Sequence, residues 1–77
     1  MTAPAGAIVG LYVDLLRSVH EQDVIETPSG RRYLVMSVRV QLRGIHRGRQ
    51  HLRALVMQPD AALPDGAFTH HIIWYKR

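Results

Sequence analysis

The sequence predicts a small, mainly β protein of the α+β class, in which a strongly bent antiparallel sheet or partly closed barrel carries one N-terminal helix. Two observations predict the sheet: apolar and polar residues alternate over 34–43, and proline- and glycine-containing turns separate the apolar segments. A third observation, an apolar ladder with helical spacing near the N-terminus, predicts the helix. A chain of 77 residues suits one domain with a thin core.

Residues 1–7 are small and without periodicity, so an irregular start is expected. A helix is predicted over 7–21 because apolar residues then recur with helical spacing. The stripe consists of Ile8, Leu11, Tyr12, Leu15, Leu16 and Val19. Gly10 and three valines lower the helix propensity, and the alternative is a strand over 7–13, which the β-branched residues would permit. Any part of the stripe left exposed would form a self-complementary face, so we expect a partner surface or a homodimer there, with a monomer as the alternative.

The remainder of the chain, residues 23–77, is predicted to form the β structure. A short strand over 24–27 precedes a Pro-Ser-Gly turn. In the long strand that follows, even-numbered apolar residues are expected to face the core: Leu34, Met36, Val38, Val40 and Leu42. A glycine-punctuated loop over 44–49 joins it to a second strand over 51–57, which makes a long antiparallel hairpin. A final strand is predicted over 71–75.

Charge is distributed unevenly along the chain. Between Thr27 and Pro59 there is no acidic residue, yet seven arginines occur there, so this stretch carries +7 while the whole chain carries +4. All six acidic residues lie before or after it. Such polarisation is typical of a protein with one surface that meets a polyanion. The competing interpretation is a solvated hairpin that keeps a small protein soluble.

The candidate binding residues are the basic side chains of the predicted hairpin and of the C-terminus. Arginine binds phosphate with a bidentate fork, and Gly44 and Gly48 would let a phosphate approach the loop backbone. The predicted nucleic-acid-binding set is Arg39, Arg43, Arg47, Arg49, Arg53, Lys76 and Arg77. An acidic protein partner would also be compatible with these charges.

Trp74 and Tyr75 are candidates for stacking on a base, because they stand beside Lys76 and Arg77. Adjacent residues of a strand point to opposite faces, so one ring is expected in the core and the other partly exposed. The favoured interpretation is that Trp74 closes the core with Ile72.

The segment Asp23-Val-Ile-Glu-Thr-Pro-Ser-Gly-Arg-Arg-Tyr-Leu-Val resembles the opening of small Src-homology-3-like barrels. The later segments Arg43-Gly-Ile-His-Arg-Gly-Arg-Gln-His-Leu-Arg and Ile73-Trp-Tyr-Lys-Arg resemble parts of small uncharacterised proteins encoded by actinobacterial phages. The resemblance covers residues 23–77 and implies a compact binding module. It transfers no catalytic residues.

Several functional classes are not favoured by the sequence. The chain has no cysteine, which excludes thiolate chemistry and disulfides. Its five histidines lack metal-ligand spacing, and no acid–base pair stands out, so no metal, cofactor or catalytic site is expected and a small ribonuclease is disfavoured. With no apolar run of membrane length and no basic leader, we expect a protein of the host bacterial cytoplasm. The leading hypothesis is a phage-encoded, largely sequence-independent DNA- or RNA-binding module; the alternative is a protein–protein adaptor or minor virion component.

Overall fold

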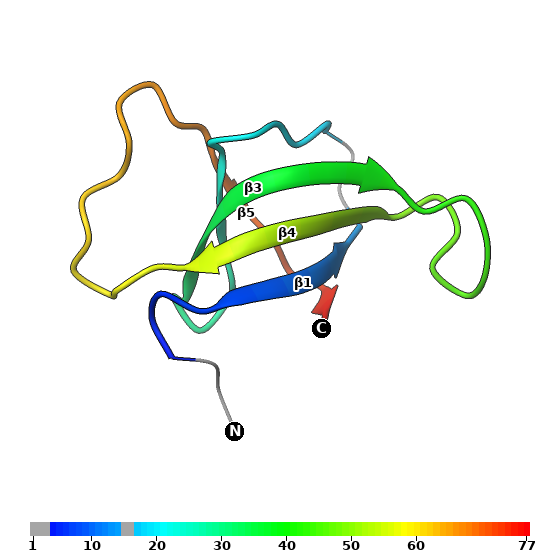
Figure 1. Ribbon diagram of the computed structural model, residues 1–77, viewed down its shortest axis with the longest axis horizontal. Coiled ribbons are helices and arrows are strands. Elements are labelled where there is room, and N and C mark those ends of the chain that lie inside the picture. The colour runs from blue at the N-terminus through cyan, green and yellow to red at the C-terminus, as the bar shows by residue number, and fades with distance from the viewer. Residues whose placement is uncertain (1–3, 15–16) are drawn as a thin grey trace.

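The computed structural model describes residues 4–14 and 17–77, which form one curled six-stranded sheet (Figure 1). In chain order the strands are β1 (Ile8–Val13), β2 (Val24–Glu26), β3 (Arg32–Val40), β4 (Gln50–Val56), β5 (Thr69–His71) and β6 (Tyr75–Lys76). Across the sheet the order is β5-β2-β3-β4-β1-β6. Every pairing is antiparallel except that of β2 with β5, which is parallel. The mainly β class is therefore confirmed.

The predicted helix over 7–21 is wrong. Residues 8–13 form β1, and no helix occurs in the part of the chain that the structure describes. All six residues of β1 pair with β4, which buries Leu11 completely and satisfies backbone groups along one side of the strand. The alternative strand over 7–13 is the correct prediction, because the β-branched side chains favour an extended backbone here and Gly10 is a poor helix former.

The predicted partner stripe is consequently divided between two faces of the sheet. Leu11 and Val19 belong to the buried core, whereas Ile8 is 50% exposed and Tyr12 is half-buried on the opposite face. Leu15 and Leu16 lie outside the described residues, as does the start of the predicted irregular segment at residues 1–3. No helical face is left in the described part of the chain to act as a docking surface.

A β-bulge in β3 changes which residues of that strand face the core. The register with β4 shifts between Val35 and Ser37. Before the shift the odd-numbered Tyr33 and Val35 are buried, and after it the even-numbered Val38 packs against the core. The prediction that all even positions face inward is therefore wrong before the bulge, and Met36 is exposed. The extra residue of a bulge reverses the alternation of faces.

The β3–β4 hairpin itself is confirmed, and its second strand has the predicted faces. Leu52, Ala54 and Val56 are all buried in the core, while Arg53 between them is exposed. The predicted inward positions Val40 and Leu42 are exposed instead, because the ladder between β3 and β4 ends at Val40.

The two outermost strands of the sheet are joined by a very short connection. β5 ends at His71 and β6 begins at Tyr75, so the predicted strand over 71–75 is interrupted. Because three residues connect opposite edges of the sheet, the sheet must curl into a half-barrel, and Ile72 of the connection is buried inside the curl. The core cluster consists of Val9, Leu11, Val13, Val19, Ile25, Tyr33, Val35, Leu52, Ala54, Val56 and Ile72.

Candidate nucleic-acid interface

One row of side chains crosses four strands on the outer face of the sheet. Lys76 of β6 pairs with Tyr12 of β1, Tyr12 pairs with His51 of β4, and His51 pairs with Arg39 of β3. Paired residues of neighbouring strands project to the same face. The pairing register thus brings two cations and two aromatic rings, distant in the sequence, into one line across the sheet.

Arg53 occupies the next row of the same face. Its neighbours on the two flanking strands are Gly10, which has no side chain, and Ser37, whose side chain is small, so Arg53 is left exposed. A shallow depression of about 380 Å³ lies between Arg39, His51 and Arg53. Gly10 is required here for space, because a Cβ at this position would stand 3.1 Å from Nε2 of His51.

The β3–β4 loop folds back onto this row through stacked rings. The imidazole of His46 stacks on Tyr12 with centroids 4.2 Å apart and planes 20° from parallel, and His51 contacts Tyr12 at 4.6 Å. The guanidinium of Arg49 lies 4.1 Å above the centre of the Trp74 ring, and Nη1 of Arg49 donates a hydrogen bond of 2.9 Å to Nδ1 of His46. Since a guanidinium only donates, His46 must accept at Nδ1 and carry its proton on Nε2.

No ion pair among the described residues neutralises this surface. Their ion pairs involve only the carboxylates of Asp23 and Glu26, neither of which pairs with Arg39, Arg49, Arg53 or Lys76. Burial, and then the nearby positive charge of Arg39, lower the pKa of His51 below its usual value of 6.5. The positive charge of this face therefore comes from Arg39, Arg49, Arg53 and Lys76 rather than from His51, and no ion pair among the described residues neutralises it.

The other predicted basic residues lie around this face without forming part of the row. Arg43 and Arg47 are exposed in the β3–β4 loop, where Gly44 and Gly48 both have a positive φ that favours glycine, and Arg77 is exposed beyond β6. The structure thus brings together Arg39, Arg49, Arg53 and Lys76, and leaves the remaining three predicted residues more separate.

Trp74 and Tyr75 occupy the opposite positions to those favoured by the sequence, which placed Trp74 in the core. Tyr75 packs against the core and pairs with Val13, whereas Trp74 is half-buried beneath Arg49. The interruption of the final strand between His71 and Tyr75 causes this exchange, because the alternation of faces that would place Trp74 beside the buried Ile72 does not continue across it. The sequence did not place Tyr12, His46 and His51 at this interface, because their positions depend on the strand pairing of β1 and β6; Tyr12 was expected on a helical partner face instead.

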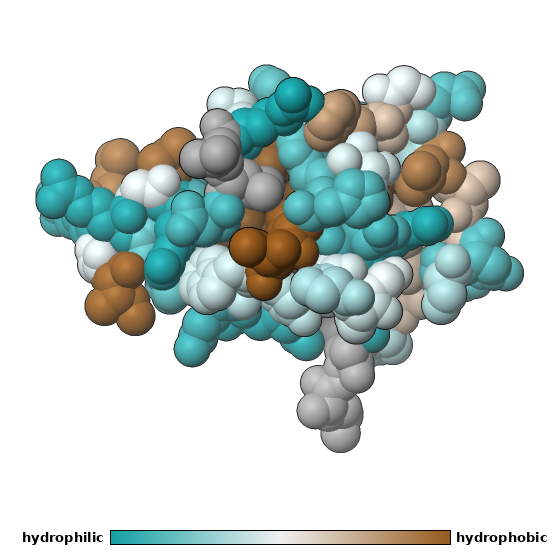
Figure 2. All heavy atoms as spheres, turned by 180° about the vertical axis from the view of Figure 1, so that it is seen from behind, coloured by the Kyte–Doolittle hydropathy of each residue, from teal (hydrophilic) through white to brown (hydrophobic). Residues whose placement is uncertain are grey.

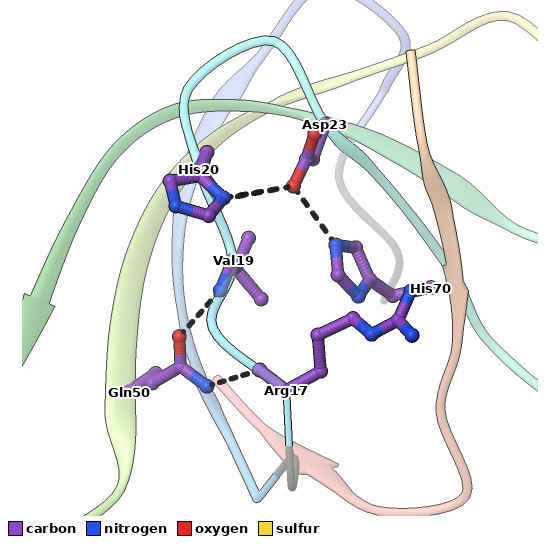
Figure 3. A network of polar contacts seen from close by, with 6 residues as sticks. All are labelled: Arg17, Val19, His20, Asp23, Gln50 and His70. Carbon is purple, nitrogen blue, oxygen red and sulfur yellow. Dashed lines mark hydrogen bonds and ion pairs between the residues drawn. The ribbon is translucent and has the colours of Figure 1, made fainter.

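A second cluster of histidines lies on the other side of the sheet, where the segment before β2 meets β5 (Figure 3). Oδ2 of Asp23 accepts a 2.9 Å hydrogen bond from Nε2 of the buried His70 and another of 2.9 Å from the backbone N–H of His20. Burial raises the pKa of Asp23, but these hydrogen bonds outweigh it and hold the pKa below its usual value of 3.8. The carboxylate is thus ionised at neutral pH, and the proton of this bond resides on His70.

Gln50 of β4 forms hydrogen bonds to the backbone of residues 17–19, in the segment before β2. Its Oε1 accepts a 2.9 Å hydrogen bond from the backbone N–H of Val19, and its Nε2 donates one of 3.1 Å to the carbonyl of Arg17. One side chain of β4 therefore satisfies two backbone groups of a segment without regular structure, which holds Val19 in the core.

The neighbouring histidine of β5 uses a different carboxylate. Nδ1 of His71 lies 3.0 Å from Oε2 of Glu26, whose Oε1 accepts a 3.2 Å hydrogen bond from Nε of Arg32. His70 and His71 thus point to opposite faces, as predicted, and each meets an acid of the region before or within β2. No group of three potential metal ligands is found over residues 4–14 and 17–77.

No protein-family model, no curated protein and no solved structure matches this chain. In the described ranges there is no helix long and apolar enough to cross a membrane.

Proposed function

We propose that this protein binds nucleic acid through the cationic outer face formed by Arg39, Arg49, Arg53 and Lys76. The observation that supports the proposal best is the continuous row Lys76–Tyr12–His51–Arg39, which places charge and rings together with no carboxylate among the described residues beside it. Positive groups on a pleated surface contact phosphates with little preference for sequence. We infer a phage-encoded module that acts in the host cytoplasm and performs no chemistry.

The side chains have separate roles in this proposal. Arg39 and Arg53 are exposed and form charge-assisted bonds to successive phosphates, while Lys76 supplies a point charge at the end of the row. Trp74 and Tyr12 offer ring faces to an unpaired base once Arg49 and His46 move aside. The likeness to Src-homology-3-like barrels is part of the same proposal, and the curled sheet supports it.

The test is the salt dependence of affinity for generic single- and double-stranded oligonucleotides. If arginines neutralise phosphates, log affinity falls linearly with log salt, with a slope of about 0.9 per contact on duplex DNA. Arg39→Ala and Arg53→Ala should each reduce that slope by about 0.9, which is the contribution of one phosphate contact. The matched control is Arg17→Ala, which removes the same charge from the far side, where Arg17 lies 4.5 Å above Phe68. A slope that falls equally in all three variants would refute a localised interface.

A second candidate function, that of a protein-binding adaptor or minor virion component, is favoured by one apolar surface. Ile73 is 96% exposed, and with the half-exposed Phe68 it lines a depression of about 460 Å³ beside β5. Figure 2 shows the molecule from behind, where an apolar patch stands among hydrophilic side chains. Exposed apolar groups of this kind mark interaction sites. Absence of oligonucleotide binding at low salt, together with retention of a protein from nuclease-treated host lysate that Ile73→Ser abolishes, would favour the adaptor.

A further inference from the structure

Strand β1 has an open edge. On one side all six of its residues pair with β4, but on the other side only Tyr12 and Val13 pair, with β6 (Figure 1). The stretch from Ile8 to Leu11 has no strand partner there among the described residues. Ile8 and Gly10 are exposed. Open edges are templates for pairing with another strand.

The hydrogen-bond pattern shows which backbone groups point to that edge. The backbone N–H of Val56 donates a 2.9 Å hydrogen bond to the carbonyl of Ala7, so Ile8 and Leu55 form a non-hydrogen-bonded pair of the ladder. The alternation then directs Val9 and Leu11 towards β4 and directs Ile8 and Gly10 away from it. The open edge of β1 therefore presents the backbone N–H and carbonyl groups of Ile8 and Gly10, which are two donors and two acceptors.

We propose that a second copy of this chain pairs its β1 with this edge, antiparallel about a two-fold axis at Val9. Ile8 of each copy then lies opposite Gly10 of the other, and two such pairs satisfy all four free backbone groups. Self-pairing is favoured over a longer extended peptide because the edge is short. β6 occupies the ladder from Tyr12 onward, and at the other end the chain turns away at Gly6, which has a φ of +88°.

The side chains at the edge fit the same arrangement. Ile8 is the exposed apolar residue of β1, and in the pairing it packs beside Gly10 of the second copy, which has no side chain to obstruct it. Side-by-side pairing of strands keeps the faces of a sheet in register. Both outer faces would consequently lie on the same side of the dimer.

The chain has no cysteine, so single cysteines can test this register directly. The two Val9 residues would form a non-hydrogen-bonded pair with α-carbons about 4.5 Å apart, which is compatible with a disulfide. The two Ile8 α-carbons would be displaced by two residues along the strands and lie about 8 Å apart, which is too far. Under a mild oxidant we expect Val9→Cys to become mostly disulfide-linked dimer and Ile8→Cys to remain mostly monomer, although position 8 is the more exposed.

Equal cross-linking of the two variants, or faster cross-linking of Ile8→Cys, would overturn the proposal. Because Val9 belongs to the core, a second measurement uses the unmodified chain in sedimentation equilibrium. Its apparent mass should rise towards a dimer with concentration, and Ile8→Pro should abolish that rise. Proline at position 8 removes a donor that faces the open edge and leaves the β4 ladder intact, so its melting curve should stay two-state. A full-length chain that remains monomeric at millimolar concentration would refute self-pairing whatever the cysteine variants do.

Discussion

Two groups of histidines in this small sheet have opposite surroundings. His70 and His71 of β5 each meet a carboxylate, and His70 is almost fully buried against Asp23. His46 and His51, by contrast, contact Tyr12 and lie among arginines. A carboxylate gives the N–H of a histidine a partner that ties two segments of the fold together, whereas positive neighbours disfavour the charged form of a histidine, as Arg39 does at His51. Function in this protein is therefore better inferred from the neighbours of a residue than from its type.

The largest expected effect is at His70, which meets the carboxylate of Asp23. His70→Ala removes a buried ring and leaves Asp23 without its side-chain partner, so the free energy of unfolding should fall by roughly 2–3 kcal/mol. Chemical denaturation measures it. His20→Ala is the control, because that ring is 78% exposed and 3.9 Å from Asp23, and it should cost well under half as much. Equal losses would show that the buried pair has no special role.

The second-largest effect is expected on the stability of the protein in acid. The pKa of Asp23 is lower in the folded protein than its usual 3.8, so its contribution to stability is complete above that value and is lost as pH falls through the folded pKa. Asp23→Asn should flatten the decline of the melting temperature below about pH 4. Thermal melts of both proteins between pH 2 and 7 would measure this difference. If the melting temperature of Asp23→Asn declined in acid as steeply as that of the unmodified protein, the role assigned to Asp23 would be contradicted.

A smaller effect is expected where the loop meets the C-terminal strand. Arg49→Ala removes the cation–π contact with Trp74 and should lower the free energy of unfolding by about 0.5–1 kcal/mol. Arg47→Ala, which deletes the same charge from an exposed position of the same loop, should leave stability unchanged. A quenched or shifted Trp74 fluorescence signal that changes only in Arg49→Ala would confirm the contact independently.

The smallest effect concerns the cationic row itself. Arg39→Ala removes the second cause that depresses the pKa of His51, so that pKa should rise towards 6.5 while burial continues to hold it down. An NMR titration of the imidazole resonances reports this directly. His20, which has no arginine opposite it in a strand pair, serves as the internal reference, and a fall in the pKa of His51 would contradict the placement of Arg39.

The β3–β4 hairpin could be predicted from the sequence because its evidence is local. Apolar Leu52, Ala54 and Val56 alternate with polar residues within a single strand, and a glycine-containing loop precedes them. The N-terminal element was mispredicted because Ile8, Leu11 and Tyr12 satisfy a helical period, while Val9, Leu11 and Val13 satisfy a strand period equally well. Only the pairing with β4 selects the second pattern.

Other features have no local signal at all. Asp23 and His70 are 47 positions apart and meet only because β5 adds in parallel to β2. The bulge at Met36 depends on how β3 matches β4, and alternation read along one strand does not reveal it. For the candidate interface, the excess of arginine was visible in the sequence, but the ring partners Tyr12, His46 and His51 required knowledge of three strand registers.

The pairing of β6 with β1 has a consequence for synthesis in the cell. Of the six strands, β1 is synthesised first. Its neighbour on the side away from β4 is β6, which is synthesised last. β5 and Ile72, which close the half-barrel and complete the core, are also late. The nascent chain can form the β3–β4 hairpin early, but it exposes an unfinished apolar interior until those residues are released. Until then the growing polypeptide presents an exposed apolar surface of the kind that chaperones recognise.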